Sequence, residues 1–307
     1  MKRLFSVLFL LVLLACQQTG NNKKETTAPP AAKDFERVLP PVFMKDVTEQ
    51  ANFLVNHYWD HFNFKDTMYV HAPNIMKPAF LQFISIFQYA SPNKISEGVA
   101  KLMKSAEADS VMFMYFRQEA ELVLYEPNSP YRNDEYYIPF LEQIVNTSIL
   151  DDTHKIRPRY VLNLALKNRP GNKAADIQYT TANGRQENLY GVKSEYLLLM
   201  FYNPGCSECK NTMGMIQNSA EISPLVKNGT IKVVVVYPDE NIDKWKEYIK
   251  EIPSNWVNGY DKSLKIREEE IYDVKAIPTL YLLDKDKKVI LKDCSIDNIN
   301  QFLKVNP

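Results

Sequence analysis

The sequence predicts an α+β protein of two domains, an all-α domain followed by a mixed α/β domain. Of nine glycines, only Gly20 and Gly98 precede residue 170, and glycine-poor sequence suits helices because Gly costs about 1 kcal/mol relative to Ala inside one. Apolar residues recur at helical spacing in the first half, whereas continuous apolar runs of strand length stand in the second. The length of 307 residues is enough for about two domains.

The composition excludes several classes of protein. Basic and acidic residues number 37 each, so the net charge is zero, and 45% of the residues are apolar. Such values are typical of a soluble globular protein and exclude a disordered chain, a multi-span membrane protein and a chain that binds nucleic acid through bulk charge. Four cysteines are too few for a disulfide scaffold.

The first 34 residues predict an export signal and a tether. A cationic head over residues 1–3 precedes an apolar run over residues 4–15, which is shorter than the roughly 20 residues that span a bilayer and is typical of a secretory signal peptide. The run leads into Cys16 through a sequence that resembles the lipobox of bacterial lipoproteins. The resemblance implies that residues 1–15 are removed and Cys16 is lipidated, which leaves a net charge of about −2; the alternative is an ordinary signal peptide. Residues 17–34 hold no large apolar residue and predict a disordered tether.

A helical domain is predicted over residues 35–168. Its six helices are expected at about residues 47–62, 79–87, 92–106, 110–125, 134–150 and 157–168. Ser91 is the expected N-cap of the third helix, with Pro92 in its first turn, and Pro139 is tolerated only in the first turns of the fifth. Six helices of this size predict a small bundle-like domain.

The helical domain carries no motif that identifies a function. His57 and His61 stand four residues apart on one helix face, a spacing that suits a metal. Tyr58 replaces the glutamate of an HExxH motif and the sequence offers no third ligand nearby, so a polar rim beside the core is favoured. The aromatic residues of this half predict core packing, with a peptide-binding groove as the alternative.

A mixed sheet flanked by helices is predicted over residues 169–307. The pair Asn183-Gly184, flanked by stretches over residues 176–180 and 188–192, indicates a hairpin turn. Residues 196–202 and 231–237 are apolar runs typical of strands buried on both faces. Further helices are expected at about residues 207–220, 242–252, 264–272 and 296–303, with a second hairpin over 279–292 and Ser295 as the last helix cap.

Cys206 and Cys209 follow the first long strand, at the start of a predicted helix. Residues three apart in a helical turn have Cα atoms about 5 Å apart, which is within the range for a disulfide. The first sulfur lies at the helix N-terminus, where free N–H groups and the macrodipole stabilise a thiolate. This pattern predicts Cys206 as the nucleophile and Cys209 as the resolving thiol. A purely structural disulfide between them would stabilise the fold by only about 2 kcal/mol. A zinc site would need two more ligands, and only Cys294 is left.

The strand–CxxC–helix arrangement resembles the thioredoxin superfamily, most of all its extracytoplasmic, membrane-tethered TlpA/ResA-like branch, over about residues 170–307. The sequence Ile277-Pro278-Thr279 matches the second signature of that family, a cis-proline loop opposite the CxxC. The resemblance implies that Pro278 is cis and covers Cys206, and that the backbone of Ile277 contacts the substrate chain. No cofactor is implied apart from the redox-active disulfide of Cys206 and Cys209.

The active-site sequence also departs from that family. Met200 stands where thioredoxins have a buried Asp, Gly205 where a Trp commonly precedes the first Cys, and Thr212 where ResA-like proteins have a Glu. The base that deprotonates Cys209 is therefore unassigned, with Glu208 as the nearest candidate for proton transfer or pKa modulation and solvent as the alternative. A carboxylate beside the thiols opposes thiolate formation, which predicts a reductant-like potential.

These features predict an envelope lipoprotein that exchanges disulfides with extracytoplasmic proteins and is lipid-anchored facing the periplasm, with surface exposure left open. The expected partners are extracytoplasmic protein thiols and disulfides, a membrane electron donor or other thiol–disulfide partner, and the membrane; nucleic acid is not expected. The alternative is a lipid-anchored binding or scaffold protein, whose helical domain engages a partner while the thioredoxin-like domain serves for docking. Cys294 is predicted to be a small buried apolar residue, with a third redox thiol as the alternative.

Overall fold

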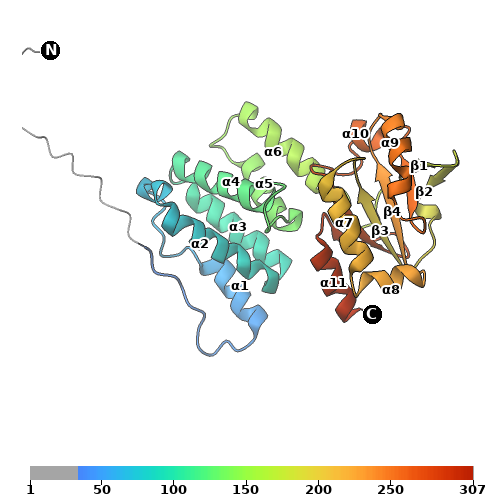
Figure 1. The fold of residues 1–307 in the computed structure, drawn as a ribbon. Coiled ribbons are helices and arrows are strands. Elements are labelled where there is room, and N and C mark those ends of the chain that lie inside the picture. Colours follow the sequence, from blue (N-terminus) through green and yellow to red (C-terminus); the bar gives the residue numbers. More distant parts are fainter. Residues whose placement is uncertain (1–33, 307) are drawn as a thin grey trace, which may run out of the picture.

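The computed structural model describes residues 34–306, so the predicted signal peptide, Cys16 and the tether up to residue 33 lie outside the described residues. The chain forms a helical domain and, beside it, a single sheet covered by helices on both faces (Figure 1). The predicted α+β fold class is confirmed. Within residues 34–306, no helix combines the length and the apolar character needed to cross a bilayer.

The helical domain packs six α-helices around one aromatic core. The helices are α1 (Val47–His57), α2 (Pro73–Ile86), α3 (Pro92–Ala106), α4 (Ser110–Leu124), α5 (Asp134–Asn146) and α6 (Asp152–Ala165). The ring of Phe116 is fully buried and packs edge to face on Trp59, with ring centroids 5.1 Å apart. Edge-to-face pairs of this kind add to the stability that burial alone provides. The buried aromatic residues of this half therefore form the core, as predicted, whereas Phe43, Tyr89, Tyr131 and Tyr160 are exposed.

Two helices begin earlier than predicted. The prediction starts each helix at or near a proline, but in the structure that proline lies inside the helix. α2 extends through Pro78, and α6 begins five residues before the predicted start and includes Pro158. The start of α6 is set by Asp151, whose carboxylate accepts a hydrogen bond of 2.9 Å from the N–H of His154. A proline near the first turns removes one backbone hydrogen bond and still permits the helix to continue.

The ends of α1 and α5 and the cap of α3 also differ from the prediction. α1 ends at His57, after which the chain turns so that Phe62 still reaches the core, and α5 ends at Asn146 rather than near residue 150. Ser91 occupies the N-cap position of α3 but its side chain does not cap the helix. Asn52 of α1 bonds it instead, accepting from the Ser91 N–H at 2.8 Å and donating to its hydroxyl at 3.2 Å.

The second domain is built on a seven-stranded sheet in the order β2-β1-β5-β4-β3-β6-β7. The strands are β1 (Gln178–Thr181), β2 (Gln186–Asn188), β3 (Tyr196–Phe201), β4 (Ile231–Tyr237), β5 (Val257–Tyr260), β6 (Thr279–Asp284) and β7 (Val289–Lys292). β3 runs parallel to β4 and antiparallel to β6. Because β3 and β4 have neighbours on both edges and are covered on both faces, both are apolar along almost their whole length, as predicted.

Five helices cover the sheet. They are α7 (Ser207–Asn218), α8 (Ile222–Lys227), α9 (Ile242–Tyr248), α10 (Lys265–Glu268) and α11 (Ile296–Val305). One face of β3, with Leu198 and Met200, packs against α7, α8, α9 and α11. The other face, with Leu197 and Leu199, packs against α10 and the segment that precedes β3. α7 and α11 lie side by side on the first face (Figure 1).

Three predicted elements of this domain differ in the structure. The helix predicted over 264–272 is reduced to α10, because Leu264 and Glu270 on either side of it have left-handed backbones, with φ of 55° and 49°. The helix predicted over 242–252 is divided into α9 and a 3₁₀ turn over residues 249–251. The hairpin stretch predicted over 188–192 is replaced by β2 over residues 186–188 and a 3₁₀ turn over residues 189–191. The sequence does not predict α8. Ser295 caps α11, as predicted, and the structure adds a reciprocal bond to the Asn298 side chain.

A buried group of charges joins the two domains. This interdomain ion cluster consists of Arg132, Asp134, Asp273, Lys275, Lys292 and Asp293. Asp134, the first residue of α5, lies 2.8 Å from the ammonium of Lys275 and 2.9 Å from that of Lys292, while Arg132 pairs with Asp293 at 2.8 Å. Three carboxylates thus balance three cations, which is what burial of charge requires.

The cluster also holds the C-terminal end of α6. The ammonium of Lys292 donates to the carbonyls of Ala165 and Lys167, each at 2.7 Å, and so satisfies acceptors that a helix end leaves unpaired. Asn168 continues the contact by donating to the carbonyl of Ile271 at 2.8 Å and accepting from the N–H of Ala175 at 2.7 Å. The last turn of the helical domain is therefore bonded to the second domain through backbone groups.

Candidate functional site

Cys206 lies at the junction between the central strand β3 and the helix α7. β3 ends at Phe201, and the loop that follows passes through Gly205, whose φ of 77° is a left-handed conformation that favours glycine. Cys206 is the N-cap residue of α7, and its sulfur accepts a hydrogen bond of 3.1 Å from the N–H of Cys209. The sulfur thus meets the unpaired N–H groups and the positive end of the helix dipole, which stabilise a thiolate.

The two cysteines differ in their surroundings. Cys206 is partly exposed, whereas Cys209 is completely buried, and both are free thiols in this structure. Burial, together with the hydrogen bond to Cys206, raises the pKa of Cys209 to about 12. An exposed sulfur at the helix start can attack an external disulfide, whereas a buried, protonated one can attack only a disulfide formed on its neighbour.

The strand register brings the proline loop to the same edge of the sheet. Phe201 of β3 lies opposite Thr279 of β6, so the residues that follow Phe201 and those that precede Thr279 emerge together. The Ile277–Pro278 peptide bond is cis, which confirms that expectation. Ile277 and Cys206 both pack against the core that contains Cys209. The structure therefore places the four predicted residues at one site, while the roles of Ile277 and Pro278 stay predictions.

The other two cysteine-related predictions concern Glu208 and Cys294. Glu208 lies exposed in the first turn of α7, where its carboxylate accepts a hydrogen bond of 3.4 Å from Asn211; its part in proton transfer stays a prediction. Cys294 follows β7 and is buried, with its sulfur 3.7 Å from the carbonyl oxygen of Leu280. Burial raises the pKa of Cys294 to about 12. These surroundings suit a small apolar residue rather than a third redox thiol.

Polar residues near the buried thiol were not predicted. Cys209 shares its core with Tyr202 and Trp245, whose hydroxyl and indole N–H both donate to the side-chain oxygen of Asn258, at 2.9 Å and 3.2 Å. Burial raises the pKa of Tyr202. The position of Tyr202 directly after β3 could have indicated that it lies near the cysteines. Asn258 is brought there by the pairing of β5 with β4, which the sequence does not reveal.

The two histidines on α1 and just after it have ordinary surroundings. His57 stacks on Phe53 with ring centroids 4.4 Å apart, and its Nδ1 lies 2.7 Å from a carboxylate oxygen of Asp60. His61 is exposed. Over residues 34–306, no three or more His, Cys, Asp or Glu side chains gather in a way that could hold a metal ion.

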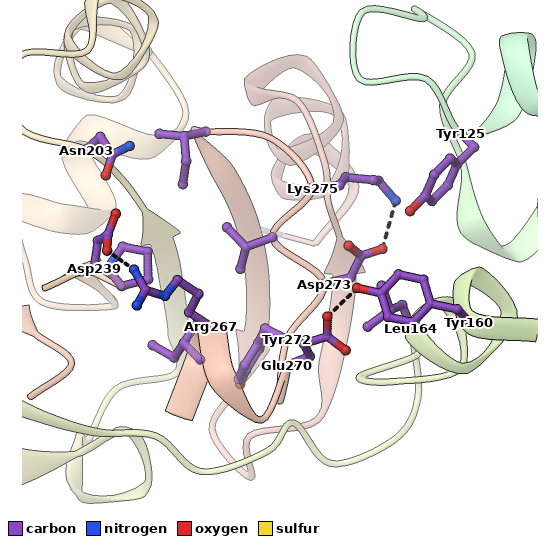
Figure 2. A pocket seen from close by; sticks show the side chains of 14 residues that line it. Tyr125, Tyr160, Leu164, Asn203, Asp239, Arg267, Glu270, Tyr272, Asp273 and Lys275 are labelled. Carbon is purple, nitrogen blue, oxygen red and sulfur yellow. Dashed lines mark hydrogen bonds and ion pairs between the residues drawn. The ribbon is translucent and has the colours of Figure 1, made fainter. Parts of the chain in front are cut away.

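A cleft of about 340 Å³ opens between the domains, beside the proline loop (Figure 2). The helical domain contributes Tyr125 and Tyr160 to it, and the second domain contributes Asn203, Glu270 and Ile277. Asn203 stands three residues before Cys206, and Ile277 directly precedes the cis-proline. No pattern in the sequence predicts this cleft, because its walls come from distant segments; Tyr160 and Glu270, which meet across it, are 110 residues apart.

Family comparisons match both halves of the chain. Residues 15–168 match the family described as DUF5106, a domain of unknown function. Residues 194–289 match the family described as thioredoxin-like. The two matches correspond to the helical domain and to most of the sheet domain.

Similarity to individual proteins extends over both domains. A thioredoxin-like protein from Bacteroides caccae, known from its crystal structure, is 40% identical; the similarity covers 90% of this chain and 100% of that one, with a TM-score of 0.85. The thiol-disulfide oxidoreductase ResA of Bacillus cereus is 27% identical over 122 residues, which cover 40% of this chain and 68% of ResA. ResA of Bacillus thuringiensis is 27% identical over 137 residues, 44% of this chain and 76% of that protein.

Proposed function

The chain belongs to the DUF5106 family and carries a thioredoxin-like domain after it, and on this premise we propose that it is a thiol–disulfide oxidoreductase of the bacterial cell envelope. One observation carries the proposal. The partly exposed sulfur of Cys206 caps the helix whose first turn contains the buried Cys209, and the cis-proline loop lies at the same edge of the sheet. Similarity to ResA over the same domain supports this chemistry.

The reaction follows from the difference between the two cysteines. The thiolate of Cys206 attacks one sulfur of a substrate disulfide, so that a mixed disulfide forms and the other substrate sulfur leaves as a thiol. Cys209 then loses its proton and attacks the sulfur of Cys206, which releases the second substrate thiol. The substrate gains two electrons and two protons, and the protein is left with a disulfide between Cys206 and Cys209.

The remaining parts of the proposal concern direction and place. A carboxylate on Glu208, in the same helical turn, and the buried surroundings of Cys209 both disfavour thiolates. A less stabilised dithiol is the better reductant, so we assign the protein a reductase direction. The apolar run before Cys16 supports secretion and lipid anchoring. Substrate disulfides and the thiol partner that restores the dithiol would then be extracytoplasmic.

A trapping experiment tests the exchange reaction. Cys209→Ser keeps the attacking sulfur and removes the resolving one, so mixed disulfides with substrate proteins should accumulate and disappear on treatment with dithiothreitol. Cys206→Ser should trap none, and Cys294→Ser, which alters a buried thiol outside the site, should behave like the unmodified protein. If the Cys206→Ser/Cys209→Ser variant keeps full biological function, the domain serves for docking and the proposed chemistry is wrong.

The redox potential of the same couple tests the direction. Equilibration with glutathione should place the Cys206–Cys209 couple closer to that of thioredoxin, about −270 mV, than to that of the strong oxidant DsbA, about −120 mV. A value near −120 mV would contradict the reductase direction and leave the exchange chemistry intact.

A further inference from the structure

The cleft between the domains lies where a substrate must pass. It adjoins Ile277, whose backbone is expected from the family resemblance to contact the substrate chain, and Asn203 in the loop that leads to Cys206. Its volume of about 340 Å³ is at the low end of the range for ligand pockets, which suits one or two side chains. Any polypeptide whose cysteine reaches Cys206 along the proline loop therefore has neighbouring residues beside this cleft.

Most charged groups around the cleft are already paired. Arg267 pairs with Asp239, and Lys275 lies 3.2 Å from Asp273. Among the charged residues that line the cleft, Glu270 is the exception. Within residues 34–306 no cation lies within ion-pair distance of its carboxylate, which accepts one side-chain hydrogen bond, from the hydroxyl of Tyr160. Figure 2 shows these two side chains meeting from opposite domains. Among the residues that line the cleft, Glu270 thus carries the one charge without an ion pair, and the nearby Lys167 ammonium bonds its backbone carbonyl rather than its carboxylate.

The position of Glu270 is imposed by the helical domain. Its φ of 49° is a left-handed conformation, which costs a residue with a side chain free energy and persists only where surrounding contacts hold it. Those contacts come from the last turn of the helical domain. The ammonium of Lys167 donates to the carbonyl of Glu270 at 2.7 Å, and Asn168 holds the carbonyl of Ile271. Strained backbone of this kind gathers at binding sites.

We propose that this cleft binds an arginine or lysine side chain of the substrate polypeptide while the substrate cysteine reacts with Cys206. The inference rests on the proposed function. A guanidinium stacks on the exposed ring of Tyr160 and donates to the carboxylate of Glu270, while its aliphatic stem lies against Leu164. An acidic side chain in the same place would be repelled. The helical domain is thereby a specificity domain for the redox domain.

Peptides with a single glutathionylated cysteine test the proposal on the reduced full chain. Each peptide carries arginine, norleucine or glutamate at one position within three residues of the cysteine. In one turnover the peptide–glutathione disulfide takes two electrons from Cys206 and Cys209 and yields the peptide thiol and glutathione. At the best position we expect the arginine peptide to react about tenfold faster than the norleucine peptide, and the glutamate peptide to be slowest.

Two variants locate the effect. Glu270→Gln removes the charge and keeps an acceptor for Tyr160, so it should abolish the tenfold preference for arginine, which is read as the ratio of the arginine to the norleucine rate after both are normalised to the rate of the same variant with neutral hydroxyethyl disulfide. Glu269→Gln is the matched control. It removes a carboxylate from the neighbouring residue, whose side chain does not line the cleft. It should retain the preference.

Each other outcome has a definite meaning. If the three peptides react equally fast at every position, or if Glu269→Gln removes the preference as fully as Glu270→Gln does, the cleft does not recognise a basic side chain and the proposal is wrong, while the exchange function stands. If neither the peptides nor hydroxyethyl disulfide oxidise Cys206 and Cys209, the proposed function is wrong and the inference falls with it.

Discussion

Cys206 and Cys209 stand three residues apart, yet the fold gives their sulfur atoms different chemistry. The N-cap position of Cys206 leaves its sulfur partly exposed and in contact with a helix N–H. One turn later Cys209 faces the core, where burial raises its pKa to about 12. In the proposed disulfide exchange, helix geometry sets the order of events, because only one of the two sulfurs is exposed to a substrate.

Alkylation of the reduced protein checks this difference. At pH 8 a thiol with a pKa of about 12 is ionised to about one part in ten thousand, and only the thiolate reacts with iodoacetamide. We expect modification of Cys206, with Cys209 and Cys294 left unmodified, as read by mass spectrometry of peptides. Because the thiolate fraction rises with pH below the pKa, each added pH unit should speed the slow reaction of Cys209 about tenfold. Equal labelling of Cys206 and Cys209 at pH 8 would contradict the assignment.

At the scale of elements, two glycines inside helices serve different purposes. Gly98 lies in α3 where α1 crosses it, and a Cβ built there would lie 2.4 Å from the backbone oxygen of Val55. Gly214 lies in α7, where a Cβ would meet nothing within 4 Å. The close approach of α1 and α3 therefore depends on the absence of a side chain at residue 98, whereas residue 214 has no such requirement.

Alanine at these two positions should have opposite effects on stability. Gly98→Ala forces α1 away from α3, and we expect the free energy of unfolding to fall by about 1–3 kcal/mol, the usual cost of overpacking. Gly214→Ala should raise it by about 0.5–1 kcal/mol, because alanine loses less backbone entropy in a helix. Urea denaturation followed by circular dichroism measures both. A neutral Gly98→Ala would show that the two helices are free to separate.

For the whole molecule, the interdomain ion cluster decides how the two domains sit together. Burial alone would raise the pKa of Asp134, but the ammonium groups of Lys275 and Lys292 outweigh it and hold that pKa below its usual value. Burial alone would lower the pKa of Lys275, and the surrounding carboxylates, led by Asp134, raise it instead. Lys275 stands three residues before the cis-proline, so the cluster fixes the helical domain against the loop of the redox site.

Removal of the central carboxylate should destabilise the protein strongly. Asp134→Asn leaves two buried lysines short of a partner, and we expect a loss of about 3–5 kcal/mol in the free energy of unfolding. Glu126→Gln, which alters an exposed carboxylate of the same domain, should change it by less than about 0.5 kcal/mol. Denaturant titrations at pH 7 give both values. Similar effects of the two substitutions would mean that the cluster contributes nothing specific.

The pH dependence of this loss has a definite sign. Because the folded pKa of Asp134 lies below the unfolded value of about 3.9, its contribution is fully present above about pH 4 and is lost as the pH falls through the folded pKa. The difference in stability between the unmodified protein and Asp134→Asn should therefore shrink below pH 4. Burial raises the pKa of Asp293. Because Asp293 is present in both proteins, its titration does not enter the difference between them.

The sequence predicts most elements of the fold because their signals are local. The strand over residues 231–237 and the capping of α11 by Ser295 follow from a run of β-branched residues and from one cap. The helix predicted over 264–272 fails for the opposite reason. Its apolar spacing is helical, but contacts from Lys167 hold Glu270 in a left-handed conformation that ends α10, and no local pattern reports them.

By itself the sequence determined the two-domain α+β class, the position of the two cysteines at a helix start and the cis-proline loop, since each depends on residues close together in the chain. The structure alone decided what lies between the domains. Asp134 and Lys275 are 141 residues apart in the chain, and Tyr160 and Glu270 are 110 apart. Contacts over such separations arise only after each domain has buried its own core, so their charges and the cleft they enclose have no signature in the order of residues.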